Sequence, residues 1–137
     1  MLCQLFLVIV LPLPQQRPLF PPGVWYLHVI TQDRVGPVIN LPPRIDASLE
    51  LADSSYSGFS GCNGFRGSCT IRKDSLFLGV SAGTKKYCPG VRSEVEDLLD
   101  RKLFGGAARF YTVRDTLVIE AASRYSFRFC RAAVTSE

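Results

Sequence analysis

Alternation of apolar and polar residues dominates this chain and predicts strands. Residues 24–30 are rich in aromatic and β-branched side chains, and in residues 45–51 the apolar positions alternate with Asp, Ser and Glu. Residues 36–43, with Gly36-Pro37 and Pro42-Pro43, predict a long irregular connection. Further strands are predicted at residues 56–59, 68–71, 76–78, 108–113, 116–120 and 125–129.

One segment has a helical rather than a strand-like period. Its apolar positions, Val95, Leu98, Leu99 and Leu103, fall on one stripe. Ser93 followed by Glu96 predicts a capping box at the start, and Gly105-Gly106 predicts the end. Acidic residues precede the basic pair Arg101-Lys102, which suits the helix dipole. We therefore expect one main helix in this region.

The order of these elements is five strands, one helix and three strands. Short polar stretches of hairpin length, such as residues 72–75 and Arg114-Asp115, join successive strands. This order predicts an α+β fold with a mostly antiparallel sheet of about seven to eight strands and one main α-helix.

The first 22 residues differ from the rest of the chain. Residues 5–11 form an apolar run that is too short to span a bilayer and resembles the central region of a secretory leader. No Lys or Arg precedes the run, and no small-x-small cleavage site follows it, so a disordered proline-rich tail or a misassigned start is the alternative. We therefore divide the chain into a leader or tail (1–22), one domain (23–132) and a short tail (133–137).

Composition is that of a globular domain. The chain has 137 residues, 47% of them hydrophobic and 20% charged, which allows one ordinary core and makes wholesale disorder improbable. The net charge of +4 is not gathered into Lys/Arg blocks, so charge alone identifies no partner. Because the chain has 5 cysteines, at least one thiol is left over if the others pair.

Two cysteine-containing segments carry the most distinctive motif. The first is Gly61-Cys62-Asn63-Gly64-Phe65-Arg66-Gly67, where glycines and an asparagine indicate a sharp turn or a close backbone approach. The second runs from Thr84 to Cys88-Pro89, after which Gly90 precedes the predicted helix. Both segments are typical of a structural framework rather than of an active site.

Cys62 and Cys88 have two interpretations. A disulfide would close a loop of about 26 residues and stabilise the fold by about 3 kcal/mol. Alternatively, both are buried reduced thiols that pack as small hydrophobes. The disulfide is the better interpretation if the protein is exported. Cys69 and Cys130 lie in predicted strands, and we expect both to be packed side chains.

Few sequence features support a catalytic site, a metal site or a nucleic-acid-binding surface. No Cys-x-x-Cys pair occurs, and His28, the only histidine, lies within a predicted strand, so neither a metal nor another cofactor is expected. A cysteine nucleophile would need His28 and an orienting carboxylate beside a thiol, which no motif indicates. Residues 124–131 interleave basic and aromatic residues as single-strand binders do. Their alternation places the aromatic residues on one face, which favours a core strand.

Together these motifs resemble the META domain family, which includes HslJ-like heat-inducible bacterial envelope proteins and the META proteins of trypanosomatid parasites. The resemblance rests on residues 25–30, the Gly-Cys-Asn segment, Thr-x-x-x-Cys-Pro and the strand at 116–119, in order, from about Val24 to Phe129. It implies a small α/β or cracked-barrel module without enzymatic activity, often exported. The motif residues implied to be structural are Gly61, Cys62, Asn63, Phe65, Gly67, Thr84, Cys88 and Pro89.

One position and one three-residue segment depart from the family pattern. Cys69 replaces an aromatic residue, and Lys85-Lys86-Tyr87 replaces Arg-Met-Ala before the second cysteine. The resemblance implies a non-catalytic, stress- or virulence-related module, monomeric, that binds a protein or lipid partner. It would be secreted or in the envelope if the leader is genuine, and cytoplasmic otherwise. The alternatives are a small thiol-dependent enzyme or enzyme inhibitor that uses Cys69, and a nucleic-acid-binding module.

Overall fold

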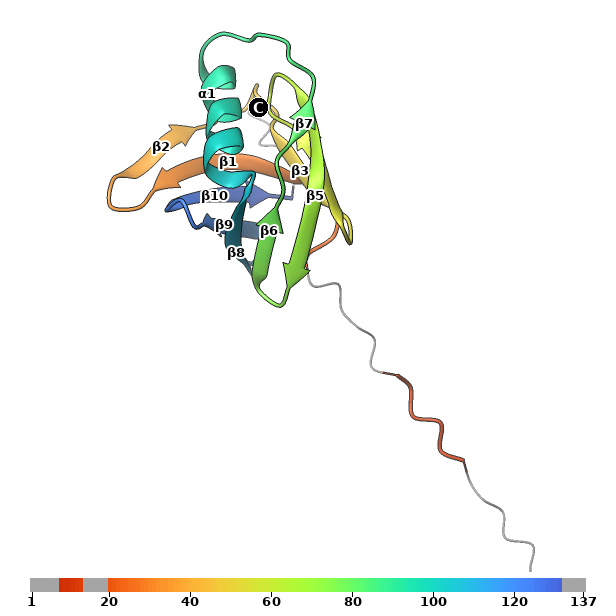
Figure 1. Cartoon of the computed structure of the whole chain (residues 1–137). Coiled ribbons are helices and arrows are strands. Elements are labelled where there is room, and N and C mark those ends of the chain that lie inside the picture. Colours follow the sequence, from red (N-terminus) through yellow and green to blue (C-terminus); the bar gives the residue numbers. More distant parts are fainter. Residues whose placement is uncertain (1–7, 14–19, 132–137) are drawn as a thin grey trace, which may run out of the picture.

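A computed structural model gives the fold of the chain and describes residues 8–13 and 20–131 (Figure 1). Seven strands precede the helical segment and three follow it. The strands before the helix are β1 (Trp25–Gln32), β2 (Gly36–Asn40), β3 (Ser48–Leu51), β4 (Ser55–Phe59), β5 (Gly64–Arg72), β6 (Ser75–Leu78) and β7 (Ala82–Gly83). The helical segment comprises α1 (Val91–Leu98) and η1 (Leu99–Leu103), and the last strands are β8 (Gly106–Val113), β9 (Thr116–Ala121) and β10 (Tyr125–Cys130).

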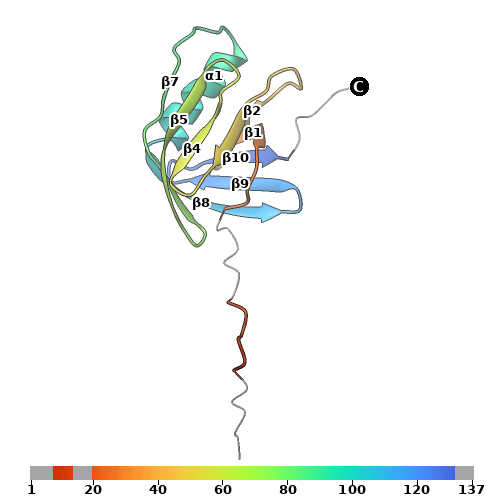
Figure 2. The same ribbon diagram turned by 90° about the vertical axis from the view of Figure 1, so that its right-hand side faces the viewer.

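The sheet closes into a barrel because the first and last strands pair. The path β10-β9-β8-β6-β5-β4-β3-β1 is antiparallel throughout, and β1 pairs with β10 over Tyr26–Gln32. Eight of the strands thus form a closed ring, which leaves no unpaired edge within it. Figure 2 shows β8, β9 and β10 following one another around the wall. The predicted α+β class and the mostly antiparallel barrel are confirmed.

The two remaining strands lie outside the ring and were not predicted. β2 pairs with β1, with Ile39 opposite Ile30, so the prediction of an irregular connection over residues 36–43 is wrong for its first part. Pro37 is tolerated because β2 is an edge strand, where a missing N–H leaves no ladder bond unmade. β7 is a two-residue strand paired with β5, which is too short to leave an alternation pattern.

The barrel interior is filled by side chains from every part of the ring. Buried and less buried residues alternate along most strands of the ring, as the pattern predicted, although β9 has three successive buried residues. Trp25, Tyr56, Phe127 and Phe129 are each exposed by 1% or less. Together with buried Leu and Ile residues they form one continuous core.

The helical segment closes over the barrel with the predicted apolar stripe. Val95, Leu99 and Leu103 are buried, and Leu98 is half-buried. Leu99 and Leu103 lie in the π-helical turn, where the amide of Phe104 donates to the carbonyl of Leu99. This wider turn brings both leucines among barrel residues such as Leu27 and Leu49.

The predicted capping box is wrong. The helix begins one turn earlier than Ser93 implied, with Gly90 at the N-cap in a left-handed conformation (φ 76°) and no side-chain cap. Ser93 Oγ donates instead to the Gly90 carbonyl (3.2 Å). Glu96 does not take part in a capping box. Its carboxylate accepts hydrogen bonds from Ser60 and Asn63 instead.

The chain enters β1 at the end of the barrel away from α1 in both views (Figures 1 and 2). Phe20 is buried there, with its ring 4.9 Å from that of Phe110. Trp25 Nε1 donates to the Pro21 carbonyl, and the Arg131 guanidinium lies 3.9 Å from the centre of the Trp25 ring. Phe20, which belongs to the segment predicted as leader or tail, is therefore part of the packed barrel.

Most of the two predicted tails lies outside the described residues. This applies to residues 1–7 and 14–19 of the predicted leader and to the predicted tail 133–137. Residues 8–13 expose their apolar side chains, including Val10 and Leu13. No helix in the described part of the chain has the length and apolar character needed to cross a bilayer.

Candidate functional site

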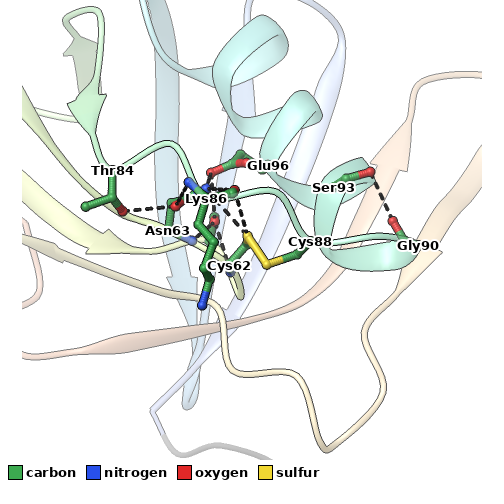
Figure 3. The surroundings of a disulfide bond; sticks show 9 residues. Cys62, Asn63, Thr84, Lys86, Cys88, Gly90, Ser93 and Glu96 are labelled. Carbon is green, nitrogen blue, oxygen red and sulfur yellow. Dashed lines mark hydrogen bonds between the residues drawn. A yellow bond between two sulfur atoms is a disulfide. The ribbon is translucent and has the colours of Figure 1, made fainter.

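The two cysteine-containing segments meet beside α1 (Figure 3). We call residues 60–64 and 84–88 the cysteine corner. Cys62 and Cys88 form a disulfide, with Cα atoms 5.8 Å apart and a sequence separation of 26. The disulfide interpretation therefore describes this structure better than two reduced thiols. Cys62 is buried, and Cys88 is half-buried at the end of the second segment.

The turn that carries Cys62 is formed by local hydrogen bonds. Ser60 Oγ accepts from the amides of Cys62 (3.2 Å) and Asn63 (2.9 Å), and the Ser60 amide donates to the Asn63 carbonyl. Gly61 has φ +95°, which disfavours any residue with a Cβ atom. The local sequence Ser-Gly-Cys-Asn thus suffices to make the chain reverse direction here.

Asn63 joins the turn to the second segment. Only 3% of this residue is exposed to solvent. Asn63 Oδ1 accepts from the Lys86 amide (2.7 Å) and from Thr84 Oγ1 (3.0 Å). Asn63 Nδ2 donates to the Lys86 carbonyl (2.7 Å) and to Glu96 Oε1 (2.8 Å). Both donors and both acceptor positions of the amide are therefore used.

Glu96 fastens α1 to the same turn. Its Oε1 accepts from Asn63 Nδ2 and from Ser60 Oγ (3.2 Å). The sequence interpretation missed this role by assigning Glu96 to the capping box, and it missed Ser60 altogether. A serine two residues before Cys62 is a turn signal that could have identified Ser60.

The three remaining motif residues lie outside the cysteine corner, one directly after it and two on β5. Pro89 is exposed and directly precedes Gly90 at the helix N-cap. Phe65 and Gly67 lie farther along β5. The Phe65 ring lies 4.8 Å from the Phe104 ring, and a Cβ atom at Gly67 would lie 2.5 Å from the Tyr56 ring. The structure thus gathers five of the eight predicted residues in the cysteine corner, places Pro89 directly after it, and places the other two where β5 packs on the core.

The cysteine corner exposes basic and aromatic side chains. Lys85, Lys86 and Tyr87 are all exposed, Tyr87 by 82%. The backbone beneath them is held on both sides, by Asn63 at Lys86 and by the disulfide at Cys88. Exposed side chains on a restrained backbone are suited to contact with another molecule, because the backbone loses little conformational entropy on binding.

The two other described cysteines are unpaired, and they differ in their surroundings. Cys69 is buried, and burial raises the pKa of its thiol, to which Asp53 adds a smaller effect. Cys130 is half-buried at the end of β10. The expectation of a packed side chain is thus met fully by Cys69 and in part by Cys130.

His28 lies at an irregularity in β1. The register with β10 shifts between Leu27 and Val29, and His28 Nε2 is buried without a hydrogen-bond partner. The small hollow that it lines contains Tyr26, Leu41 and Asp46 but no cysteine. Within residues 8–13 and 20–131, no three His, Cys, Asp or Glu side chains are placed to hold a metal ion.

Comparisons with known proteins agree with this architecture. The NMR structure of a protein from Burkholderia xenovorans is similar with a TM-score of 0.66 and 20% identity, over 81% of this chain and 82% of that chain. A second NMR structure is similar with a TM-score of 0.52 and 18% identity, over 81% of this chain and 92% of that one. No curated protein matches significantly. The model of the META domain matches residues 22–134, and the chain therefore belongs to the META domain family.

Proposed function

We propose that this protein is a non-catalytic META module that is exported and acts by binding a protein or lipid partner. The observation that supports this most directly is the environment of Asn63. Every hydrogen-bonding position of its amide is used within the chain, and both motif sulfur atoms are bonded to each other. The use of these groups within the chain supports a structural role for the motif, which is to hold a surface in place.

Export is supported by the disulfide. Such bonds persist in oxidising compartments and are rare where thiols are kept reduced. The apolar run at residues 5–11 is compatible with a leader that would direct the chain there. The proposed location is thus outside the cytoplasm or in the cell envelope, where a role in stress or virulence would be exercised.

Intact mass of the protein isolated from its native host tests this location. We expect removal of an N-terminal segment that ends before Phe20, because Phe20 is packed in the barrel. We also expect the loss of two hydrogens for the disulfide. A full-length, fully reduced protein from the host would contradict the proposal.

The thiol-enzyme alternative makes a different prediction about Cys69. A catalytic thiol needs an accessible side chain with a depressed pKa, whereas Cys69 is buried and its pKa is raised. Labelling of the native protein with a disulfide reagent should therefore proceed at the same rate in the wild type and in Cys69→Ala. Rapid labelling that disappears in Cys69→Ala would favour the enzyme.

A further inference from the structure

The outer wall of the barrel has a hollow that the cysteine corner does not explain. It has a volume of about 480 Å³ and lies over β5, β6, β8 and β9, which adjoin one another in the ring. We call it the outer groove. Figure 1 shows β5, β6 and β8 side by side on this wall. Its volume is in the range of small-molecule sites, about 300–1,000 Å³.

The floor of the outer groove is apolar because of one cross-strand row. Thr70 on β5 lies opposite Phe77 on β6, and Phe77 lies opposite Ala107 on β8. Ala107 and Ala122 are too small to fill the space beside the Phe77 ring. Phe77 is 49% exposed, so this large aromatic side chain keeps contact with water unless a ligand covers it.

One rim of the outer groove is cationic because of the neighbouring row. Arg72 lies opposite Ser75, Ser75 opposite Arg109, and Arg109 opposite Glu120. The row therefore holds two guanidinium groups and one carboxylate. No described carboxylate forms an ion pair with Arg72 or Arg109. Guanidinium groups have the planar donor geometry that binds carboxylate in a bidentate manner.

The interior of the barrel leaves no room for a ligand. The space between Leu27, Leu49 and Phe129 has a free volume of about 0 Å³, because side chains fill the ring. Many eight-stranded barrels hold a small ligand inside. In this one, a ligand of that size has space only on the outside.

We propose that the outer groove binds a single-chain amphiphile with a carboxylate head group, with its tail on Phe77, Ala107 and Ala122 and its head at Arg72 and Arg109. This inference rests on the proposed binding function and names the ligand class for it. An added peptide strand fits less well, because β6 and β8 are paired on both sides here and offer no free backbone groups. A bilayer fits less well too, because the hollow over the apolar floor is also lined by Arg72, Arg109 and Glu120.

Titration of the ¹⁵N-labelled full-length protein with sodium dodecanoate below its micelle concentration tests the proposal. We expect saturable shifts of backbone amides in β5, β6, β8 and β9. Phe77→Ser should weaken binding by about tenfold or more, as expected for loss of a buried aromatic contact. The double variant Arg72→Gln/Arg109→Gln should weaken it by a similar factor, and Ala107→Leu should block the groove without removing a charge.

Matched controls lie outside the outer groove. Phe59 is exposed by 40% on β4, and Arg128 is exposed on β10. Phe59→Ser and Arg128→Gln should leave the affinity unchanged. Each variant is checked by urea unfolding, and because all the changed side chains are at least partly exposed, we expect them to fold.

Other outcomes overturn the inference. Equal binding of dodecyltrimethylammonium would show that the two guanidinium groups do not select a carboxylate head group. Binding to phosphatidylglycerol vesicles without binding to monomeric dodecanoate would identify a membrane surface as the partner instead. The absence of any amide shift would show that the groove does not bind this class of ligand. Shifts confined to residues 60–64 and 84–88 would exclude the outer groove while leaving the proposed function of the cysteine corner intact.

Discussion

Asn63 donates a hydrogen bond to Glu96 over 2.8 Å, and through this contact the cysteine-bearing turn and α1 hold each other in place. The two residues are 33 positions apart in sequence. Glu96 has no basic partner in the contact, and neutral donors from Asn63 and Ser60 satisfy its oxygen. The Asn63 amide is thereby oriented so that its other face receives Thr84 and Lys86. Four predictions follow from this arrangement and from the packing around it.

Replacing Asn63 by Ala should lower the free energy of unfolding by about 2–3 kcal/mol, because the partly buried hydrogen bonds to the Lys86 backbone and to Glu96 are lost together. Urea unfolding of the oxidised protein measures this. Thr84→Val is the matched control, since it removes only one hydrogen bond to Asn63 and should cost about 1 kcal/mol or less. Equal losses for the two variants would contradict the central role of Asn63.

The double variant Cys62→Ser/Cys88→Ser should be less stable than the wild type by about 3 kcal/mol, because its unfolded chain is no longer restrained. The control is internal. Adding a reductant should bring the wild type down to the stability of the variant and leave the variant unchanged. If the reductant destabilises both proteins equally, the disulfide is not the cause.

Gly67→Ala should destabilise the protein by about 1–3 kcal/mol, because the new methyl group would overlap the Tyr56 ring, whose atoms lie 2.5 Å from the Cβ position. Gly64→Ala is the comparison on the same strand. Its Cβ atom would lie 3.9 Å from the nearest atom, the Gly58 carbonyl oxygen, so its effect should be near zero. Thermal or urea unfolding of both variants decides the point, and similar stabilities would refute close packing at Gly67.

Stability should fall at alkaline pH because of Tyr56. Burial raises the pKa of its phenol, and Asp100 and then Cys69 raise it further, while Tyr56 donates to the Gly79 carbonyl over 2.6 Å. A raised folded-state pKa means that the unfolded chain releases its proton first. The contribution is therefore complete below the ordinary tyrosine pKa of about 10 and is lost as pH rises above it.

The pH dependence is measured by urea unfolding between neutral pH and pH about 11. Tyr56→Phe should have a flatter profile over the alkaline part, because it has no phenol to ionise. Tyr111→Phe changes a 44% exposed residue and should keep the wild-type profile. An unchanged slope in Tyr56→Phe would assign the alkaline loss to another group.

Much of the fold was predictable because strand alternation is local. The hairpin at residues 72–75 and the final strands of residues 106–130 match their predicted positions closely, since each carries its own period-two pattern and turn. β2 and β7 were missed for a physical reason. An edge strand with Pro37 and a two-residue strand gain their hydrogen bonds from neighbours, and local sequence carries no trace of them.

The cysteine corner was predictable in composition but not in its bonding. Glycines and Asn63 marked a turn, yet Glu96 had an equally good local use as half of a capping box. Burial decided between a capping role for Glu96 and its contact with Asn63. A buried amide with four hydrogen-bonding positions must find partners, and α1 packs where its Glu96 can supply one.

The sequence by itself determined the strand periods, the position of the main helix and the family to which the motifs belong, because these depend on neighbouring residues. Only the tertiary structure decided that β1 and β10 close the ring, that Cys62 and Cys88 bond to each other, and that Phe77, Arg72 and Arg109 line one groove. These relationships join residues far apart in the chain. They arise from the shared requirement to pair strand edges and to bury apolar surface, which no local pattern expresses.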